Sequence, residues 1–109
     1  MIKVSIFYPA GPETRFDHHY YERVHIPMAM ELLGGALKSV SVERGVSPGQ
    51  PWPEPAFVAI AHFVCTSKDA YEQALFPHLA RLQGDLVNYS NVTAVIQFSE
   101  ITLEHKIET

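Results

Sequence analysis

Residues 57–65 read FVAIAHFVC, and this stretch decides the fold. As a strand it presents two sets of side chains, one on each side: first Phe57, Ala59, Ala61, Phe63 and Cys65, then Val58, Ile60, His62 and Val64. A strand with one side in water alternates apolar with polar residues, whereas this strand is apolar on both sides. Helices can cover one side. A second copy of the same sheet is the simplest cover for the other, so we expect a homodimer.

The rest of the chain alternates strands and helices around this strand. Further strands are expected at 2–8, 36–46 and 92–101, and helices at 17–34 and 66–82, with a break at Phe76-Pro77. Asp17 and either Thr66 or Ser67 are the expected N-caps, and Gly34-Gly35 ends the first helix. The proline-rich stretch 47–55 is expected to be a loop. The order β-α-β-β-α-β predicts an α+β, ferredoxin-like antiparallel sheet with both helices on one face.

Composition narrows the classes of protein to consider. The 109 residues are expected to form a single domain, 1–109, and 47% hydrophobic with 18% charged residues is typical of a globular chain. A net charge of -4 gives no reason to expect nucleic acid or an anionic membrane as a partner. Cys65 is alone, which argues against a disulfide framework. No apolar run approaches the roughly 18 residues of a membrane span, so we expect a cytoplasmic protein.

The first helix carries a histidine in an unusual position. At 100° per residue, His25 lies in the middle of the apolar face, one turn after Tyr21 and nearly one turn before Met28. Pro27 is expected to kink the helix and to free the carbonyl of Arg23 beside that imidazole. Two interpretations stay open. His25 is either a functional group in a pocket or a core histidine that is bonded to the freed carbonyl.

Metal and cofactor sites are not expected. His18 and His25 would lie about 10.5 Å apart along a helix axis, which is too far for one zinc ion. The sequence has no glycine-rich phosphate loop, because Gly34-Gly35 ends a helix and starts none. His62, within a strand, and His78, directly after Pro77, are weaker candidates for contact with a ligand.

The motif F-D-x-x-Y-Y-x-x-x-H-x-P-M, residues 16–28, resembles the EthD family of the dimeric α/β-barrel superfamily. The resemblance also takes in KVSIFYPAG, FVAIAHF, FPHLARLQGDLVNYS and VIQFSEI, and so covers nearly the whole chain. Met28 stands where that motif usually has leucine. The resemblance implies a ferredoxin-like homodimer and favours a functional role for Tyr21 and His25. Family members are often labelled oxidoreductases, and relatives of the same fold include monooxygenases, isomerases, dehydratases and haem enzymes, so fold alone does not select a reaction.

The resulting functional prediction is an EthD-like oxidoreductase that acts on a small apolar or aromatic molecule between helices and sheet, without a cofactor. His25 would be the general base and Tyr21 would bind a substrate oxygen. Met28 and Leu32 would form the apolar wall, with His62 and His78 as further substrate contacts. The alternatives are a lyase or isomerase that uses the same base, and a binding protein without catalytic activity in a degradation pathway.

Overall fold

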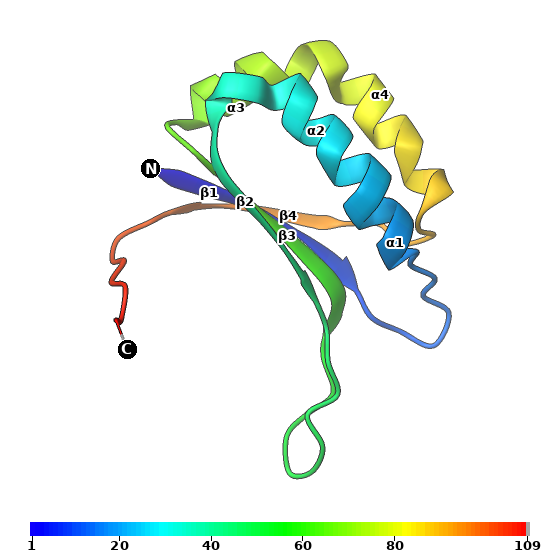
Figure 1. Cartoon of the computed structure of the whole chain (residues 1–109). Helices are drawn as coiled ribbons and strands as arrows, with labels where there is room; N and C mark the ends of the chain where they lie inside the picture. Colours follow the sequence, from blue (N-terminus) through cyan, green and yellow to red (C-terminus); the bar gives the residue numbers. More distant parts are fainter. Residues whose placement is uncertain (109) are drawn as a thin grey trace.

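Strand β3 (Phe57–Cys65) lies inside a four-stranded sheet whose order is β2-β3-β1-β4, with antiparallel neighbours throughout. The computed structural model describes residues 1–108. The other strands are β1 (Ile2–Pro9), β2 (Leu37–Arg44) and β4 (Val95–Glu100). All helices lie on one face of the sheet (Figure 1). This confirms the predicted α+β, ferredoxin-like fold.

Each of the two helical segments is a series of short helices. The first runs through α1 (His18–Tyr20), the π-helix η1 (Tyr21–His25), α2 (Ile26–Leu33) and the 3-10 turn η2 (Gly34–Ala36). The second runs through α3 (Lys68–Leu75), η3 (Phe76–His78), α4 (Leu79–Gly84) and η4 (Asp85–Asn88). The predicted N-caps are confirmed, because the side chains of Asp17 and Ser67 accept hydrogen bonds from the backbone N–H groups of Tyr20 and Ala70.

The π-helix explains how the first segment accommodates Pro27. The backbone N–H of Ile26 donates to the carbonyl of Tyr21, five residues earlier, where an α-helix would use four. Pro27 then falls in the first turn of α2, directly after the π-helix. Where the sequence predicts a kink at Pro27, the structure has a wider turn directly before it.

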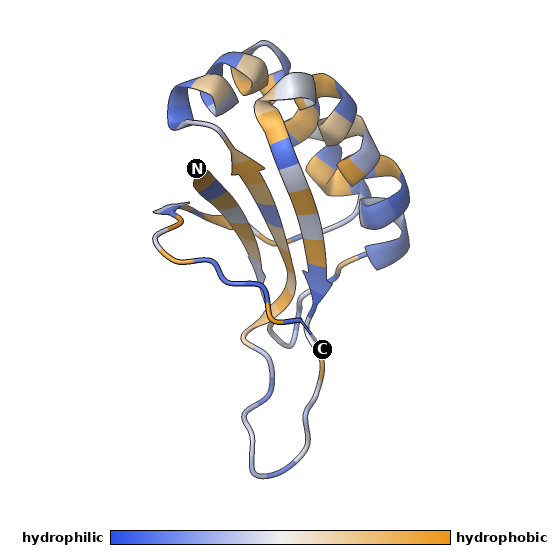
Figure 2. Ribbon diagram, turned by 60° about the vertical axis from the view of Figure 1, so that its left-hand side comes forward, coloured by the Kyte–Doolittle hydropathy of each residue, from blue (hydrophilic) through white to orange (hydrophobic). Residues whose placement is uncertain are grey.

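The two faces of β3 differ in what covers them. Ala59, Ala61, Phe63 and Cys65 are buried beneath the helices together with Val4 of β1. The opposite face carries Val58, Ile60, His62 and Val64, all half-buried. Figure 2 shows hydrophobic residues along the strands and in the helices above them. Within residues 1–108 no helix lies over that second face (Figure 1).

A long hairpin loop, residues 45–56, joins β2 to β3 and projects away from the helices (Figure 1). At its base, the N–H of Gly45 donates to the carbonyl of Val58 at 3.0 Å. Near its tip, Trp52 has 64% of its surface exposed. Among residues 1–108, no helix combines the length and the apolar character needed to cross a bilayer.

We expect Gly45→Ala to destabilise the fold. An added Cβ would lie 2.4 Å from the carbonyl oxygen of Phe57 and 2.9 Å from the Cβ of Pro55, so backbone would have to move. The free energy of unfolding in urea should fall by about 1–3 kcal/mol. Gly35→Ala is the matched control, because a Cβ there meets nothing within 4 Å. Equal stability of the two variants would contradict this account of the loop base.

Candidate functional site

A cluster of aromatic rings lies between the first helical segment and the sheet. The rings of Tyr21 and His25 stack with centroids 5.4 Å apart and planes at 13°. Tyr89 lies 4.7 Å from the ring of His25 and 4.9 Å from that of Tyr21. Tyr8 of β1 and Phe16 close the cluster, each about 5 Å from Tyr21. The imidazole is therefore held between aromatic rings and is not part of an aliphatic core.

The partner of His25 is a carboxylate sixty positions away in the chain. The Nδ1–H of His25 donates to Oδ2 of Asp85 at 2.9 Å, and only 10% and 13% of the two side chains is exposed. The other oxygen, Oδ1, accepts from the hydroxyl of Tyr20 at 2.7 Å and from Nδ2 of Asn88 at 2.9 Å. Because Asp85 accepts at Nδ1, the neutral imidazole carries its proton there and presents Nε2 as an acceptor.

Asp85 is held opposite His25 by a set of hydrogen bonds that tie its segment to the start of the helix. The N–H of Asp17 donates to the carbonyl of Tyr89 at 2.7 Å, and the hydroxyl of Ser90 donates to the carbonyl of Arg15 at 2.8 Å. The side chain of Asn91 accepts a hydrogen bond from the N–H of Arg15 and donates one to the carbonyl of Glu13. The chain therefore enters the first helix directly beside the η4 turn that carries Asp85.

Hydrogen bonds keep the Asp85 carboxyl ionised. Burial acts to raise its pKa, but the bonds from Asn88, His25 and Tyr20 and the charge of His25 together outweigh burial. The pKa of Asp85 therefore lies below its usual value, and the group is a carboxylate at neutral pH.

The Nε2 atom of His25 is accessible. Among residues 1–108, only one buried side-chain nitrogen or oxygen atom has no hydrogen-bond partner, and it is Nδ1 of His18. Nε2 of His25 makes no hydrogen bond within the described chain, so it must reach the accessible surface. His25 lines a cavity of about 340 Å³ between the helices and the sheet. The cavity walls are mainly aliphatic and include Leu33, Leu75, Leu79, Leu82, Leu86 and Ile96.

Polar side chains besides His25 also line this cavity, among them four tyrosines. Tyr8, Tyr21, Tyr71 and Tyr89 all line it, and the hydroxyls of Tyr8 and Tyr89 lie 3.0 Å apart in a hydrogen bond. Burial raises the pKa of Tyr8, Tyr21 and Tyr89, and raises that of Tyr71 to about 12. These groups therefore stay protonated at neutral pH and can donate hydrogen bonds to a ligand oxygen.

The structure brings some of the sequence-predicted site residues together and separates others. Tyr21 and His25 both line the cavity, whereas Met28 and Leu32 are half-buried outside its lining, where Ala29 and Leu33 take the wall positions. His78 in η3 is also outside the lining.

His62 faces the other side of the sheet from this cavity. Its register partner Ser5 bonds its Nδ1 at 2.7 Å, and Nε2 lies 3.5 Å from Oε1 of Glu43. Sequence reasoning missed Asp85, which directly follows the glycine expected after the second helix and is explained there by capping and turn chemistry, and it missed Tyr8 and Tyr89. The aromatic character of these two residues was their only signal.

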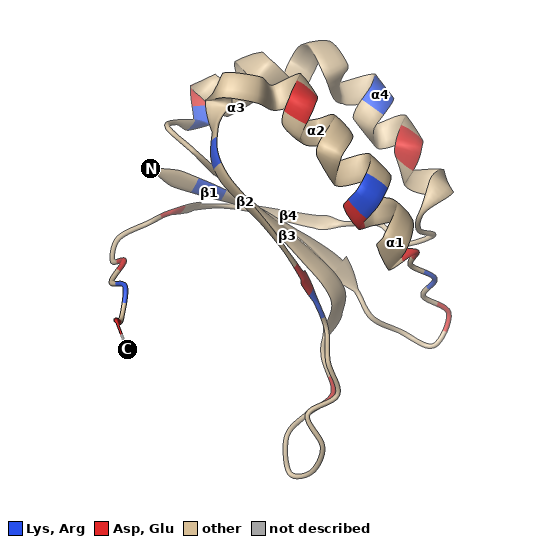
Figure 3. Cartoon of the chain, viewed as in Figure 1, with Lys and Arg blue, Asp and Glu red and all other residues tan. Residues whose placement is uncertain are grey.

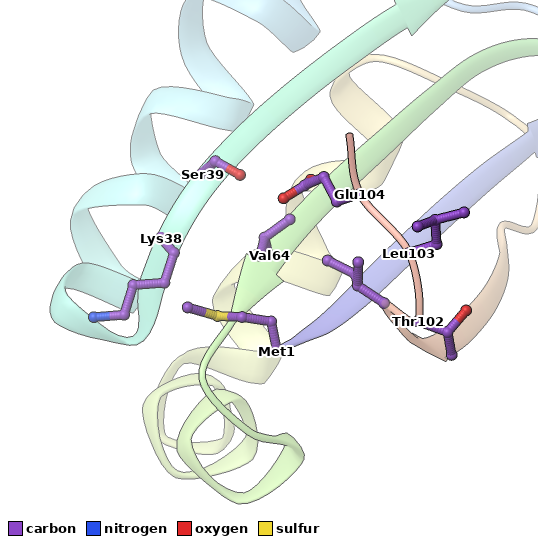
Figure 4. A pocket seen from close by; sticks show the side chains of 8 residues that line it. Met1, Lys38, Ser39, Val64, Thr102, Leu103 and Glu104 are labelled. Carbon is purple, nitrogen blue, oxygen red and sulfur yellow. The ribbon is translucent and has the colours of Figure 1, made fainter. Parts of the chain in front are cut away.

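A second hollow, of about 460 Å³, lies on the face of the sheet away from the helices. The chain after β4 passes over the sheet there, and Thr102, Leu103 and Glu104 approach Ser39 and Val64 (Figure 4). This hollow contains no histidine, cysteine or tyrosine, so it offers less chemistry than the cavity at His25. Among residues 1–108, no three His, Cys, Asp or Glu side chains are grouped as metal ligands would be.

A family model described as the EthD domain matches residues 11–93, which include His25, Asp85 and Tyr89. An EthD-like protein from Ralstonia eutropha JMP134 is 38% identical and has a TM-score of 0.89, with 95% of this chain and 94% of that chain covered. The chain belongs to the EthD family.

At lower sequence identity, the likeness to solved structures shows the fold of this EthD-family chain. An ethyl tert-butyl ether degradation (EthD) family protein from Bacillus halodurans C-125 is 17% identical, with a TM-score of 0.68 over 92% of this chain and 97% of that chain. A dimeric ferredoxin-like protein from an uncultured marine organism is 11% identical, with a TM-score of 0.51 over 98% and 100%. No curated protein sequence matches the chain significantly.

We expect Asp85→Asn to lower the free energy of unfolding by about 1.5–3 kcal/mol at pH 7, because hydrogen bonds to a charged, mostly buried group are lost. The pKa of Asp85 is lowered by folding, so its contribution is fully present above the usual aspartate pKa, about 3.9. The contribution is lost as the pH falls through the folded-state pKa. Urea unfolding at several pH values measures the difference between the proteins.

Asp69→Asn is the control for this measurement. Asp69 is exposed in the first turn of α3, so its substitution should change stability by no more than about 0.5 kcal/mol. A difference between wild type and Asp85→Asn that stays constant from pH 7 down to pH 3 would contradict the ionised, hydrogen-bonded carboxyl.

Proposed function

We propose that this EthD-family protein is an enzyme that removes a proton from a small apolar or aromatic molecule, with His25 as the general base. The observation that carries the proposal is the Asp85–His25 hydrogen bond. It fixes the proton on Nδ1 and leaves Nε2 as the only ring nitrogen able to accept a proton from a molecule in the cavity.

The surroundings of His25 suit this role. The cavity is apolar over most of its wall, which favours a largely apolar ligand. Proton transfer to Nε2 would form an imidazolium that the Asp85 carboxylate stabilises through Nδ1–H. The protonated hydroxyls of Tyr21 and Tyr8 are suited to donate hydrogen bonds to an oxygen on which negative charge develops.

The reaction after proton removal distinguishes the candidate activities. An oxidoreductase would let the substrate carbanion add to dioxygen; protonation of the peroxide anion then gives a hydroperoxide, with dioxygen as the two-electron oxidant. A lyase or isomerase would instead return the proton elsewhere or expel a leaving group, without dioxygen. A binding protein would hold the same ligand unchanged. Oxygen consumption and product analysis separate these three outcomes.

The base role can be tested with 2-tetralone, an apolar ketone with acidic protons beside its carbonyl. In D₂O the protein should catalyse exchange of those protons for deuterium. The loss of their signals in the proton NMR spectrum measures the rate of exchange. Removal of a general base typically costs about 10²–10⁴ in rate, so His25→Gln should lose nearly all catalysed exchange. His19→Gln is the matched control, because His19 is exposed on the same segment.

Asp85→Asn tests the positioning role of the carboxylate in the same assay. Without the carboxylate the Nδ1–H tautomer is no longer imposed, so the rate should fall and its pH profile should shift. Exchange at the background rate while 2-tetralone is bound, or full activity of His25→Gln, would contradict the assignment of His25 as the base.

We also propose that two copies of the chain pack with their sheets facing each other. The supporting observation is the face of the sheet that no helix covers within residues 1–108, where Phe7, Val58, Ile60 and Val64 form an apolar surface around His62. A second copy would remove these side chains from water, which is the largest favourable contribution that such a surface offers.

Light scattering at micromolar concentration should therefore give the mass of two chains. Ile60→Lys places a charge in the middle of the proposed interface and should shift the protein to the mass of one chain. Val46→Lys is the control, because Val46 is exposed in the hairpin loop and its substitution should leave the dimer intact. A wild-type mass of one chain would contradict the dimer.

A further inference from the structure

His25 lines the cavity, whereas its hydrogen-bond partner Asp85 lies outside the lining. Among residues 1–108, the lining includes no lysine and no arginine. Arg81 of α4 is exposed, although Leu79 and Leu82 on either side of it line the cavity. Figure 3 shows Lys and Arg residues on the helices, towards the ends of β1 and β2 and in loops, and none on β3 or β4.

The charge nearest to the reactive nitrogen is therefore negative. Asp85 is an ionised carboxylate in contact with the imidazole, and both side chains are largely buried. A ligand that enters as an anion would lose its hydration in an apolar cavity and would approach an imidazole that is backed by a carboxylate. Both effects oppose binding, and no cation in the lining offsets them.

A neutral ligand that carries an acidic proton meets a different situation. When its proton moves to Nε2, one bond to hydrogen breaks on the ligand and one forms on the imidazole, so the charge in the cavity does not change in total. The ligand anion then lies next to an imidazolium, whose other side is bonded to Asp85. The counter-charge is produced in the same step as the anion.

We infer that this pocket selects neutral molecules that bring their own acidic proton, such as phenols and enolisable ketones, and rejects carboxylates of the same shape. The inference rests on the proposed role of His25 and extends it to a class of substrate. The juxtaposition that carries it is one carboxylate–imidazole pair whose imidazole lines an apolar cavity that has no lysine or arginine in its wall.

Two probes of nearly the same shape test the inference: 2-naphthol, which is neutral at pH 8, and 2-naphthoate, which is an anion. Isothermal titration calorimetry at pH 8 should show that 2-naphthol binds at least tenfold more tightly. Equal or tighter binding of 2-naphthoate, or failure of both probes to bind, would overturn the inference.

A charge added to the cavity wall gives a second, independent test. Gln83 lines the cavity but is exposed, so Gln83→Lys should fold and should supply the missing cation. The affinity for 2-naphthoate should rise at least fivefold, with little change for 2-naphthol. Gln73→Lys adds the same charge on the exposed surface of α3, outside the lining, and should leave both affinities unchanged. Equal effects of the two substitutions would show that selection does not arise in the cavity.

The outcome for this inference is separable from the outcome for the base role. Preferential binding of 2-naphthol together with no catalysed exchange on 2-tetralone would contradict the role of His25 as the base and support selection of neutral ligands. Catalysed exchange that depends on His25, together with tight binding of 2-naphthoate, would support the role of His25 as the base and contradict selection of neutral ligands. The long-wavelength absorbance of bound 2-naphtholate reports directly whether the proton has moved to the protein.

Discussion

The arrangement of the helix–sheet cavity depends on a single carboxylate that accepts three hydrogen bonds. Asp85 joins Tyr20 and His25 of the first helical segment to the η4 turn of the second. The two segments are far apart in the sequence, and the carboxylate makes them one structural unit on the same face of the sheet. A buried carboxylate without these partners would be strongly unfavourable, so the contacts depend on one another. The imidazole of His25 is held in one orientation because it is one of these partners.

The fold could be predicted from local patterns because its determinants are local. The continuous apolar run at residues 57–65 located β3 to the residue, and the caps Asp17 and Ser67 located both helix starts. The site was only partly predictable. Tyr21 and His25 lie on one helical face and could be paired from spacing, whereas the Asp85–His25 bond joins residues sixty positions apart. A local pattern carries no information about such a contact.

The wall of the cavity was misplaced in the sequence interpretation for a specific reason. A regular helix with 100° per residue places Met28 and Leu32 on the face that begins at Tyr21. The π-helix puts an additional residue into the turn at Tyr21–His25, so the face that continues from Tyr21 advances by one position, to Ala29 and Leu33. Pro27 was visible in the sequence, but a proline can be accommodated by a kink or by a wider turn. Only the backbone hydrogen bond from Ile26 to Tyr21 distinguishes the two.

The placement of the aromatic residues gives the molecule two separate optical signals. The one tryptophan, Trp52, lies in the hairpin loop with 64% of its surface exposed, so its emission reports on the loop and responds little to loss of the core. Four of the five tyrosines, Tyr8, Tyr21, Tyr71 and Tyr89, line the cavity in fixed, asymmetric surroundings. Near-ultraviolet circular dichroism in the tyrosine band therefore follows the cavity, and tryptophan fluorescence follows a segment far from it. Spectroscopy can thus distinguish movement of the loop from changes at the cavity without any added label.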